Sequence, residues 1–153
     1  MSDQRELSVR PAEAGDLDAV AWVWRESALS MDGVVPDVPP LEKLRSRVDA
    51  ELRLGWDLYV AVRSERVVGM LAIKPSDALL DQIFVSPAEQ GRGVGKALLD
   101  VAKAVMPMGF RLRMAASNEK ARRFYEREGM AWTGNGIHPW TSIPVHFYGW
   151  NVD

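Results

Sequence analysis

Gln90-Gly91-Arg92-Gly93-Val94-Gly95-Lys96 places three glycines within five residues. The segment follows the strand-like stretch 79–85 and precedes apolar residues at helical spacing, which predicts a strand-to-helix connection. Glycines permit positive φ angles and a close approach of the backbone, and a helix N-terminus presents unpaired N–H groups and the positive end of a dipole. The pattern therefore indicates an anion site suited to a pyrophosphate.

Two common phosphate-binding motifs do not fit this loop. A P-loop requires Gly five residues before Gly95 and Ser or Thr after Lys96, where this chain has Gln90 and Ala97. The dinucleotide fingerprint requires Gly three residues after Gly93 or Gly95, and neither position holds one. A glycine-rich connection that binds no ligand stays open as an alternative.

The charge distribution supports an anion site in this region. Residues 90–127 hold nine Lys and Arg against three acidic residues, whereas the rest of the chain carries a net charge of −8. A solvated helix face would also produce such a segment. Because it lacks a series of interleaved aromatic residues, we expect a small phosphorylated ligand and no nucleic acid.

Composition limits the class of protein. The chain has 153 residues, 47% of them hydrophobic and 26% charged, which predicts one globular domain over residues 1–153. There is no cysteine and there are two histidines, so we expect neither a disulfide scaffold nor a metal site. Apolar runs are shorter than a membrane span and the first residues are polar, so we expect a cytoplasmic protein without membrane contact.

Periodicity predicts alternating strands and helices around one sheet. Expected strands cover residues 7–10, 57–63, 67–73, 79–85, 110–115, 130–133 and 145–151. Expected helices cover residues 16–30, 41–52, 94–105 and 118–128, the last capped by Asn118 and ended by Gly129. The fold class is therefore α/β or α+β, with a mostly antiparallel sheet of six to seven strands and about four helices.

Two segments resemble a known family. The run from Ile83 to Gly95, with its Q-x-x-G-x-G core, resembles the acyl-CoA-binding motif of the GNAT superfamily of N-acetyltransferases. A second segment looks like that family's N-x-x-A-x-x-F-Y-x-x-x-G helix, with Asn118, Ala121, Phe124-Tyr125 and Gly129. Met130 stands where the family usually has Phe. The element order also resembles the family over nearly the whole chain.

The resemblance implies acetyl transfer from acetyl-CoA to an amine, without a metal. It implies that the cofactor is bound by residues of the glycine loop, the preceding strand and the second motif: Phe84, Val85, Gln90, Gly91, Arg92, Gly93, Val94, Gly95, Lys96, Asn118, Ala121 and Tyr125. It further implies that the Val85 N–H stabilises the oxyanion and that Tyr125 is the general acid for the departing thiolate; an ordinary core tyrosine is the alternative.

A general base is also needed, because an alkylamine with a pKa near ~10.4 is protonated at pH 7. Alternation along the strand places Leu79, Asp81, Ile83 and Val85 on one face. Asp81 is the only carboxylate in that run, so it is the candidate base, although a solvated or ion-paired aspartate fits equally well. Glu26, His138 and His146 are weaker candidates.

The acceptor side is expected, by resemblance, from the loops 31–40 and 133–144. Candidate acceptor-binding residues are Trp22, Asp32, His138 and Trp140. Aromatic walls and acids suit a cationic amine with an apolar body. We therefore expect an N-acetyltransferase for a small-molecule amine, and the resemblance adds a homodimer as a further expectation. A protein N-terminal or lysine acetyltransferase and a non-catalytic acyl-CoA-binding module are the alternatives.

Overall fold

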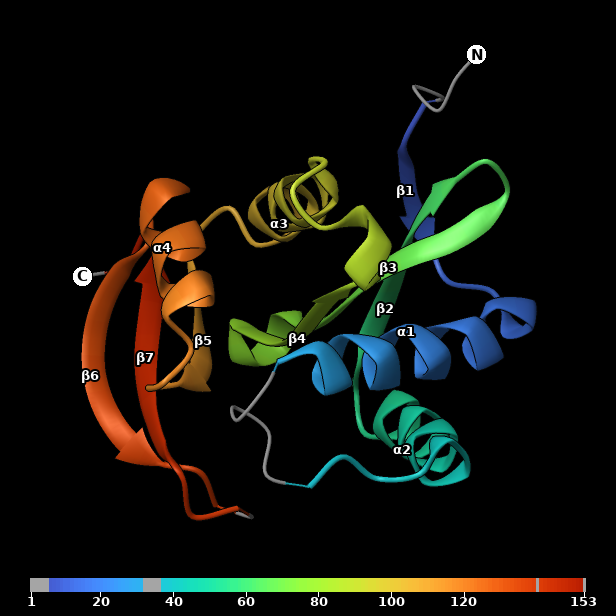
Figure 1. The fold of residues 1–153 in the computed structure, drawn as a ribbon. Helices are drawn as coiled ribbons and strands as arrows, with labels where there is room; N and C mark the ends of the chain where they lie inside the picture. The colour runs from blue at the N-terminus through green and yellow to red at the C-terminus, as the bar shows by residue number, and fades with distance from the viewer. Residues whose placement is uncertain (1–5, 32–36, 140, 153) are drawn as a thin grey trace.

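Seven strands form one sheet in the order β1-β2-β3-β4-β5-β7-β6 (Figure 1). The computed structural model describes residues 6–31, 37–139 and 141–152. Within these ranges the strands are β1 (Ser8–Pro11), β2 (Asp57–Arg63), β3 (Arg66–Lys74), β4 (Leu79–Val85), β5 (Phe110–Ala115), β6 (Ala131–Ile137) and β7 (Pro144–Trp150). Only β4 and β5 pair in parallel; the other five pairings are antiparallel, which confirms the predicted mixed sheet.

Four α-helices accompany the sheet, and they confirm the predicted class. They are α1 (Leu17–Ser30), α2 (Leu41–Arg53), α3 (Val94–Val105) and α4 (Glu119–Arg127). Gly129 ends the α4 turn with a φ of 92°, and Gly55 follows α2 with a φ of 115°. These are conformations that glycine adopts without strain. In the described part of the chain, no helix is long and apolar enough to cross a bilayer.

Two hydrophobic clusters cover the two faces of the sheet, and β3 contributes to both. One cluster joins β3 to α3 and α4, and its members include Leu71, Ile73, Leu80, Leu98, Leu112 and Tyr125. The other joins β3 to α1 and α2, and its members include Val20, Trp24, Val48, Trp56 and Met70. Because alternate residues of a strand point to opposite faces, β3 is buried on both sides.

The sheet is divided into two halves between β4 and β5. The only paired residues of these two strands are Leu79 and Arg111, supported by a bond from the Arg111 N–H to the Ala78 carbonyl (3.0 Å). Figure 1 shows β1 to β3 beside α1 and α2 in one half, and β5, β7 and β6 beside α4 in the other. Beyond Leu79 the remaining residues of β4 have no partner in β5.

The C-terminal region differs from the prediction. Residues 133–144 were expected to form a loop, but β6 continues to Ile137, where it pairs with Pro144 of β7. Strand β7 also lies between β5 and β6, so the last strand of the chain is internal and the preceding one forms the edge. Backbone pairing with β7 extends β6 through two glycines, Gly134 and Gly136, which carry no hydrophobic alternation that a sequence pattern could detect.

The packing of α3 against β3 generates a stability prediction. Leu98 is fully buried in the cluster, whereas Leu54, at the end of α2, is 70% exposed. Leu98→Ala should lower the free energy of unfolding by about 2–5 kcal/mol, because it removes buried contacts and leaves a cavity. The matched change Leu54→Ala should alter it by less than about 0.5 kcal/mol. Urea unfolding of both variants measures the difference, and equal losses would contradict the packing.

Candidate functional site

The separation of β4 from β5 exposes backbone groups at the end of β4. The Ser86 N–H donates to the Val68 carbonyl (2.8 Å), and the register pairs Phe84 with Met70. In an antiparallel ladder the bonded pairs alternate, so the N–H and C=O groups of Ile83 and Val85 point away from β3. The side chain of Gln90 donates to the Val85 carbonyl (3.3 Å). The Val85 N–H faces the side where β5 has separated, as an oxyanion donor would.

The glycine loop runs from this strand end to the first turn of α3. Gly91 and Gly93 have φ angles of 80° and 88°, and Gly93 is the N-cap of the helix. The first bond into the helix runs from the Ala97 N–H to the Gly93 carbonyl (3.1 Å). No hydrogen bond within the described ranges uses the N–H groups of residues 94–96, so these donors are available to an anion.

Ion pairs and hydrogen bonds hold the loop in place. Arg63, at the end of β2, pairs with Glu89 (3.0 Å), and both side chains are largely buried. Lys120 of α4 donates to the Gln90 side-chain oxygen (2.9 Å). Exposed Lys96 lies 3.5 Å from Asp100 and 3.4 Å from Glu128, and these charges raise its pKa. The loop is thus anchored to a strand and a second helix.

Three elements converge at Gly95 on the first turn of α3. A Cβ atom built on Gly95 would lie 3.3 Å from the Phe124 ring of α4 and 3.9 Å from a Val85 methyl of β4. The absence of a side chain at Gly95 therefore allows α4 to approach α3 beside the end of β4. This contact brings the glycine loop, the Val85 backbone and the Phe124-Tyr125 pair into one region.

Tyr125 is buried in the cluster shared by α3, α4 and the sheet. Its ring lies 5.2 Å from that of Phe124 and 6.4 Å from that of Tyr148, between centroids. Burial raises the pKa of Tyr125 well above the ordinary value for tyrosine. The hydroxyl therefore stays protonated at neutral pH. Among the described residues, the Tyr125 hydroxyl has no hydrogen-bond partner. Every fully buried side-chain nitrogen or oxygen atom there does have one, so this hydroxyl is not completely shielded from solvent.

Asn118 caps α4, as predicted. Its side-chain oxygen accepts a hydrogen bond from the Ala121 N–H (3.1 Å). The cap occupies one of the two polar atoms of the side chain and leaves the amide nitrogen for another partner. Ala121 itself packs against the cluster that contains Tyr125.

The predicted face of β4 was wrong at Asp81. The register pairs Ala72 with Gln82 but Ile73 with Leu80, so Asp81 is the extra residue of a β-bulge. Beyond a bulge the alternation shifts by one residue, which explains why Leu80, and not Asp81, shares a cluster with Ile83 and Val85. The Asp81 carboxylate instead accepts a hydrogen bond from the Trp56 indole (2.7 Å), and Trp56 belongs to the cluster on the α1 and α2 face.

The Trp56 ring that binds Asp81 belongs to a group of aromatic rings on that face, which the sequence analysis did not assign to the site. The Trp24 ring is 5.9 Å from the Trp56 ring and 5.8 Å from the Phe84 ring, and the Arg47 guanidinium lies 5.1 Å from the centroid of Trp24. Helical spacing identified Trp24 only as a core residue. Nothing in the sequence connects Trp56 with Asp81, which is 25 positions away.

The predicted acceptor residues are only partly described. His138 lies at the end of β6, half-buried, with its Nδ1 accepting from the Thr141 N–H (3.2 Å). Burial, and then the charges of Arg113 and Arg47, lower its pKa. Trp22 is 54% exposed on α1. Asp32 and Trp140 lie outside the described residues.

The alternative bases occupy other positions. His146 contacts the Asn135 side chain (2.7 Å) and the edge of the Trp132 ring on the β6–β7 hairpin. Glu26 is half-buried on α1. Neither lies on β4.

The basic segment does not form a single anion site, contrary to the simplest reading of its charge. Burial alternates along β5, with Leu112 and Met114 inside the cluster that contains α3. Arg111 and Arg113 therefore point to the opposite face. Arg92 and Lys120 remain beside the glycine loop. Folding thus divides the positive charge between the two sides of the sheet.

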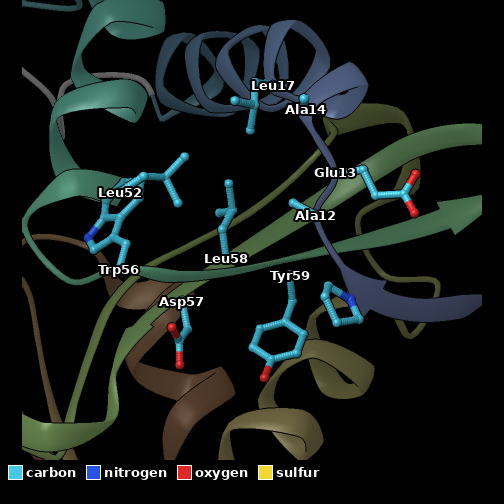
Figure 2. Close-up of a pocket in the computed structure, with 10 residues that line it drawn as sticks. Ala12, Glu13, Ala14, Leu17, Leu52, Trp56, Asp57, Leu58 and Tyr59 are labelled. Carbon is cyan, nitrogen blue, oxygen red and sulfur yellow. The ribbon is translucent and has the colours of Figure 1, made fainter.

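A hollow of about 520 Å³ lies between the start of β2 and the adjoining ends of α1 and α2 (Figure 2). Leu17, Leu52, Leu58 and Trp56 surround it, while Asp57 and Tyr59 point to the other side of β2. None of the sequence-predicted site residues lines it. Its Trp56 wall is the ring whose indole nitrogen binds Asp81, so the hollow borders the site without forming part of it.

Comparisons with known proteins agree with this geometry. A family model described as the acetyltransferase (GNAT) domain matches residues 55–129. The fold is similar to a GCN5-related N-acetyltransferase from Rhodopseudomonas palustris, with 17% identity, a TM-score of 0.77 and 99% coverage of both chains. It is also similar to the apo form of YjaB from Escherichia coli, with 22% identity, a TM-score of 0.73 and coverage of 95% of this chain and 97% of that one.

A third similar structure contains the acyl donor. It is a GNAT superfamily phosphinothricin acetyltransferase from Sinorhizobium meliloti in complex with AcCoA. The identity is 20% and the TM-score is 0.72, over 94% of this chain and 86% of that one. Identities at this level establish likeness of fold.

The left-handed N-cap of α3 generates the first site prediction. Gly93 has a φ of 88° and open space where a Cβ would lie, so a substitution there acts through the backbone angle. Gly93→Val should weaken acetyl-CoA binding at least about tenfold, or ~1.4 kcal/mol, because a β-branched residue resists positive φ. Gly93→Asn, which tolerates that angle, should lose less. Calorimetric titration measures both, and unchanged affinity in folded Gly93→Val would place the anion site elsewhere.

The cap that Asn118 forms on α4 generates the second site prediction. Asn118→Ala should lower the free energy of unfolding by about 1 kcal/mol through loss of the cap, and should also weaken acetyl-CoA binding. Asn118→Asp keeps an oxygen for the Ala121 N–H and should retain stability while losing affinity, because its amide nitrogen is gone. Thermal unfolding and cofactor titration separate the two effects. If Asn118→Asp binds and turns over normally, Asn118 is only a cap.

Proposed function

The chain belongs to the GNAT acetyltransferase family, and we propose that it transfers the acetyl group of acetyl-CoA to a primary amine of a small molecule by direct attack. The observation that supports this proposal is the backbone edge of β4 at Ile83 and Val85, which has no partner in β5 and lies beside the glycine loop and the Phe124-Tyr125 pair. The relative from Sinorhizobium meliloti, in complex with AcCoA, supports the same donor here.

The residues of the loop fit a pyrophosphate. The N–H groups of residues 94–96 are without acceptors at the start of α3, and the flanking glycines carry no side chain that would block an approaching phosphate. Arg92 and Lys120 add positive charge nearby. The Gln90 side chain bonds to the Val85 carbonyl, so an extended donor that pairs with β4 must replace that bond. Phe84 would support the donor indirectly, because its backbone pairs with Met70 and holds this part of β4 in the sheet.

Val85 would stabilise the oxyanion of the reaction. The amine nitrogen attacks the thioester carbon, a C–N bond forms, and negative charge develops on the carbonyl oxygen before the C–S bond breaks. The Val85 N–H is fixed by β4 pairing and faces away from β3. A preorganised donor of this kind needs no reorganisation when the charge appears.

Tyr125 would assist the departure of the thiolate. A thiol has an ordinary pKa near ~8.5, and burial raises the pKa of Tyr125 above its usual range. The hydroxyl is therefore always available as a donor to the sulfur. Because its pKa lies above that of a thiol, complete proton transfer to the sulfur is unfavourable, so the hydroxyl would stabilise the thiolate by donating a hydrogen bond to it as the C–S bond breaks.

Asp81 would accept the proton of the amine through water. Supplying a free alkylamine at pH 7 costs roughly 4–5 kcal/mol, given its pKa near ~10.4. Asp81 and Val85 are four residues apart, about 13 Å along a strand, which is too far for direct transfer at the reacting carbon. Trp56 fixes one carboxylate oxygen at 2.7 Å and leaves the other for a water molecule.

The acceptor side supports a small amine. His138, which follows the end of β6, is half-buried. A partly buried acceptor region suits a compact acceptor better than an extended peptide. Acetylation of a peptide N-terminus or lysine is the competing outcome of the assay below. A single domain, a homodimer and a cytoplasmic location remain predictions.

Release of CoA thiol from acetyl-CoA, measured with a panel of small amines and peptides, tests the function. With an accepted amine, Tyr125→Phe should lower kcat roughly 10²-fold, because it removes the donor to the thiolate, and should change acetyl-CoA affinity less than about threefold. Tyr148→Phe is the matched control, because the Tyr148 ring lies next to the Tyr125 ring but its hydroxyl donates to Glu126 (2.7 Å). This change should leave kcat within about twofold of the wild-type value.

The pH profile provides an independent check. In the wild-type enzyme kcat/KM should rise as the amine deprotonates, and should not fall again below pH ~10, because the raised pKa of Tyr125 keeps its hydroxyl protonated there. A Tyr125→Phe enzyme with normal kcat and rate-limiting chemistry would remove Tyr125 from the mechanism. If no amine or peptide causes release of CoA, the proposed catalysis is wrong and the alternative of a non-catalytic acyl-CoA-binding module is favoured.

A further inference from the structure

Arg63, at the end of β2, reaches the glycine loop from a strand outside both sequence motifs. Its Nε atom donates to the Glu89 carboxylate at 3.0 Å, and a terminal nitrogen of the same guanidinium donates to the Arg92 carbonyl at 3.4 Å. Glu89 comes directly before Gln90, and Arg92 lies between the first two glycines. One guanidinium is therefore connected to both the start and the middle of the loop that leads to α3.

The bond to the Arg92 carbonyl fixes the direction of a neighbouring N–H group. A trans peptide is planar, and its C=O and N–H point in opposite directions. Because the Arg92 carbonyl points toward the Arg63 guanidinium, the N–H of Gly93 points away from it. No hydrogen bond in the described part of the chain uses this N–H, so it joins the free donors of residues 94–96. If the peptide were turned over, a carbonyl oxygen would take its place and repel a phosphate.

The Glu89 carboxylate places a negative charge beside a loop that is suited to an anion. Its side chain is 15% exposed and that of Arg63 is 11% exposed, so both are largely shielded from water. The second carboxylate oxygen lies 3.5 Å from the Arg92 guanidinium. Without Arg63, the carboxylate would repel a pyrophosphate and draw Arg92 toward itself. Salt screens a partly buried charge only weakly, so this repulsion would persist at ordinary ionic strength.

We propose that Arg63 is a positioning residue for the pyrophosphate of acetyl-CoA, which it does not itself touch. It neutralises Glu89 and turns the peptide after Arg92, so that the Gly93 N–H faces the donor and the Arg92 side chain is available to it. This inference rests on the proposed function and extends the donor site to β2. Arginine suits the role because its planar guanidinium donates in two fixed directions at once, whereas a lysine ammonium acts as a point charge.

Two donors that differ in their phosphorylated part test the inference. S-acetylpantetheine has the thioester and the pantetheine arm of acetyl-CoA but lacks the pyrophosphate and the nucleotide. Arg63→Gln should raise the Kd for acetyl-CoA about tenfold or more, and should change the Kd for S-acetylpantetheine by less than about threefold. Calorimetry measures the first Kd, and ligand-observed NMR measures the second. With an accepted amine, the KM for acetyl-CoA should rise while kcat stays within about threefold, because the lost interaction is the same in the ground state and the transition state.

Further variants separate this role from a merely structural one. Arg63→Gln combined with Glu89→Gln leaves no unpaired carboxylate, so it should bind acetyl-CoA at least about threefold more tightly than Arg63→Gln alone. Arg63→Lys keeps the charge but loses the planar fork, so its Kd should lie between those of the wild type and Arg63→Gln. Arg45→Gln is the control, because Arg45 pairs with Asp18 and Asp49 on the face of the sheet opposite α3. Its Kd for acetyl-CoA should stay within about twofold of the wild-type value.

Three results would overturn the role of Arg63. They are an unchanged Kd for acetyl-CoA in folded Arg63→Gln, equal losses of affinity for both donors, and a double variant that binds acetyl-CoA no better than the single one. Wild-type protein that binds neither donor would contradict the proposed function together with this inference. Normal wild-type binding of acetyl-CoA with any of the three results would contradict the inference alone.

Discussion

Strands β4 and β5 are bonded to each other at Leu79 and Arg111 and separate beyond that point. A buried backbone N–H or C=O without a partner costs about 1–3 kcal/mol, so strands inside a sheet rarely part. Here the separation leaves the groups of Ile83 and Val85 to a ligand, to water or to the Gln90 side chain. The proposed active site is thus an interruption of the sheet, with α3 and the glycine loop on one side and α1 and α2 on the other.

The β-bulge at Asp81 determines which polar group β4 contributes to the acceptor side of the sheet. One extra residue transfers the carboxylate from the face of Ile83 to the face of Trp56, whose indole then fixes it at 2.7 Å. Trp56 in turn packs on Trp24, which stacks on Phe84. The candidate base is therefore positioned by ring packing in the core on the α1 face, whereas the proposed oxyanion donor, the Val85 N–H, points into the gap between β4 and β5.

The two sides of the opening carry different chemistry. On the α3 side, N–H groups of the first turn and the side chains of Arg92 and Lys120 suit phosphates. On the α1 side, the Arg47 guanidinium lies over the Trp24 ring, and the Trp56 indole fixes the Asp81 carboxylate. In the proposed reaction, this division would let the donor and the acceptor approach from opposite sides of the opening and meet at Val85.

The sequence by itself determined the local features. Hydrophobic spacing identified most helices and strands, the glycines at 91, 93 and 95 identified the anion-binding turn, and Asn118 identified the α4 cap, because each depends on residues a few positions apart. Only the tertiary structure decided the insertion of β7, the face of Asp81 and its contact with Trp56, and the position of the Arg47 guanidinium over Trp24. These depend on backbone pairing and on contacts between residues distant in the chain, and a bulge of one residue reverses a face that alternation alone would assign.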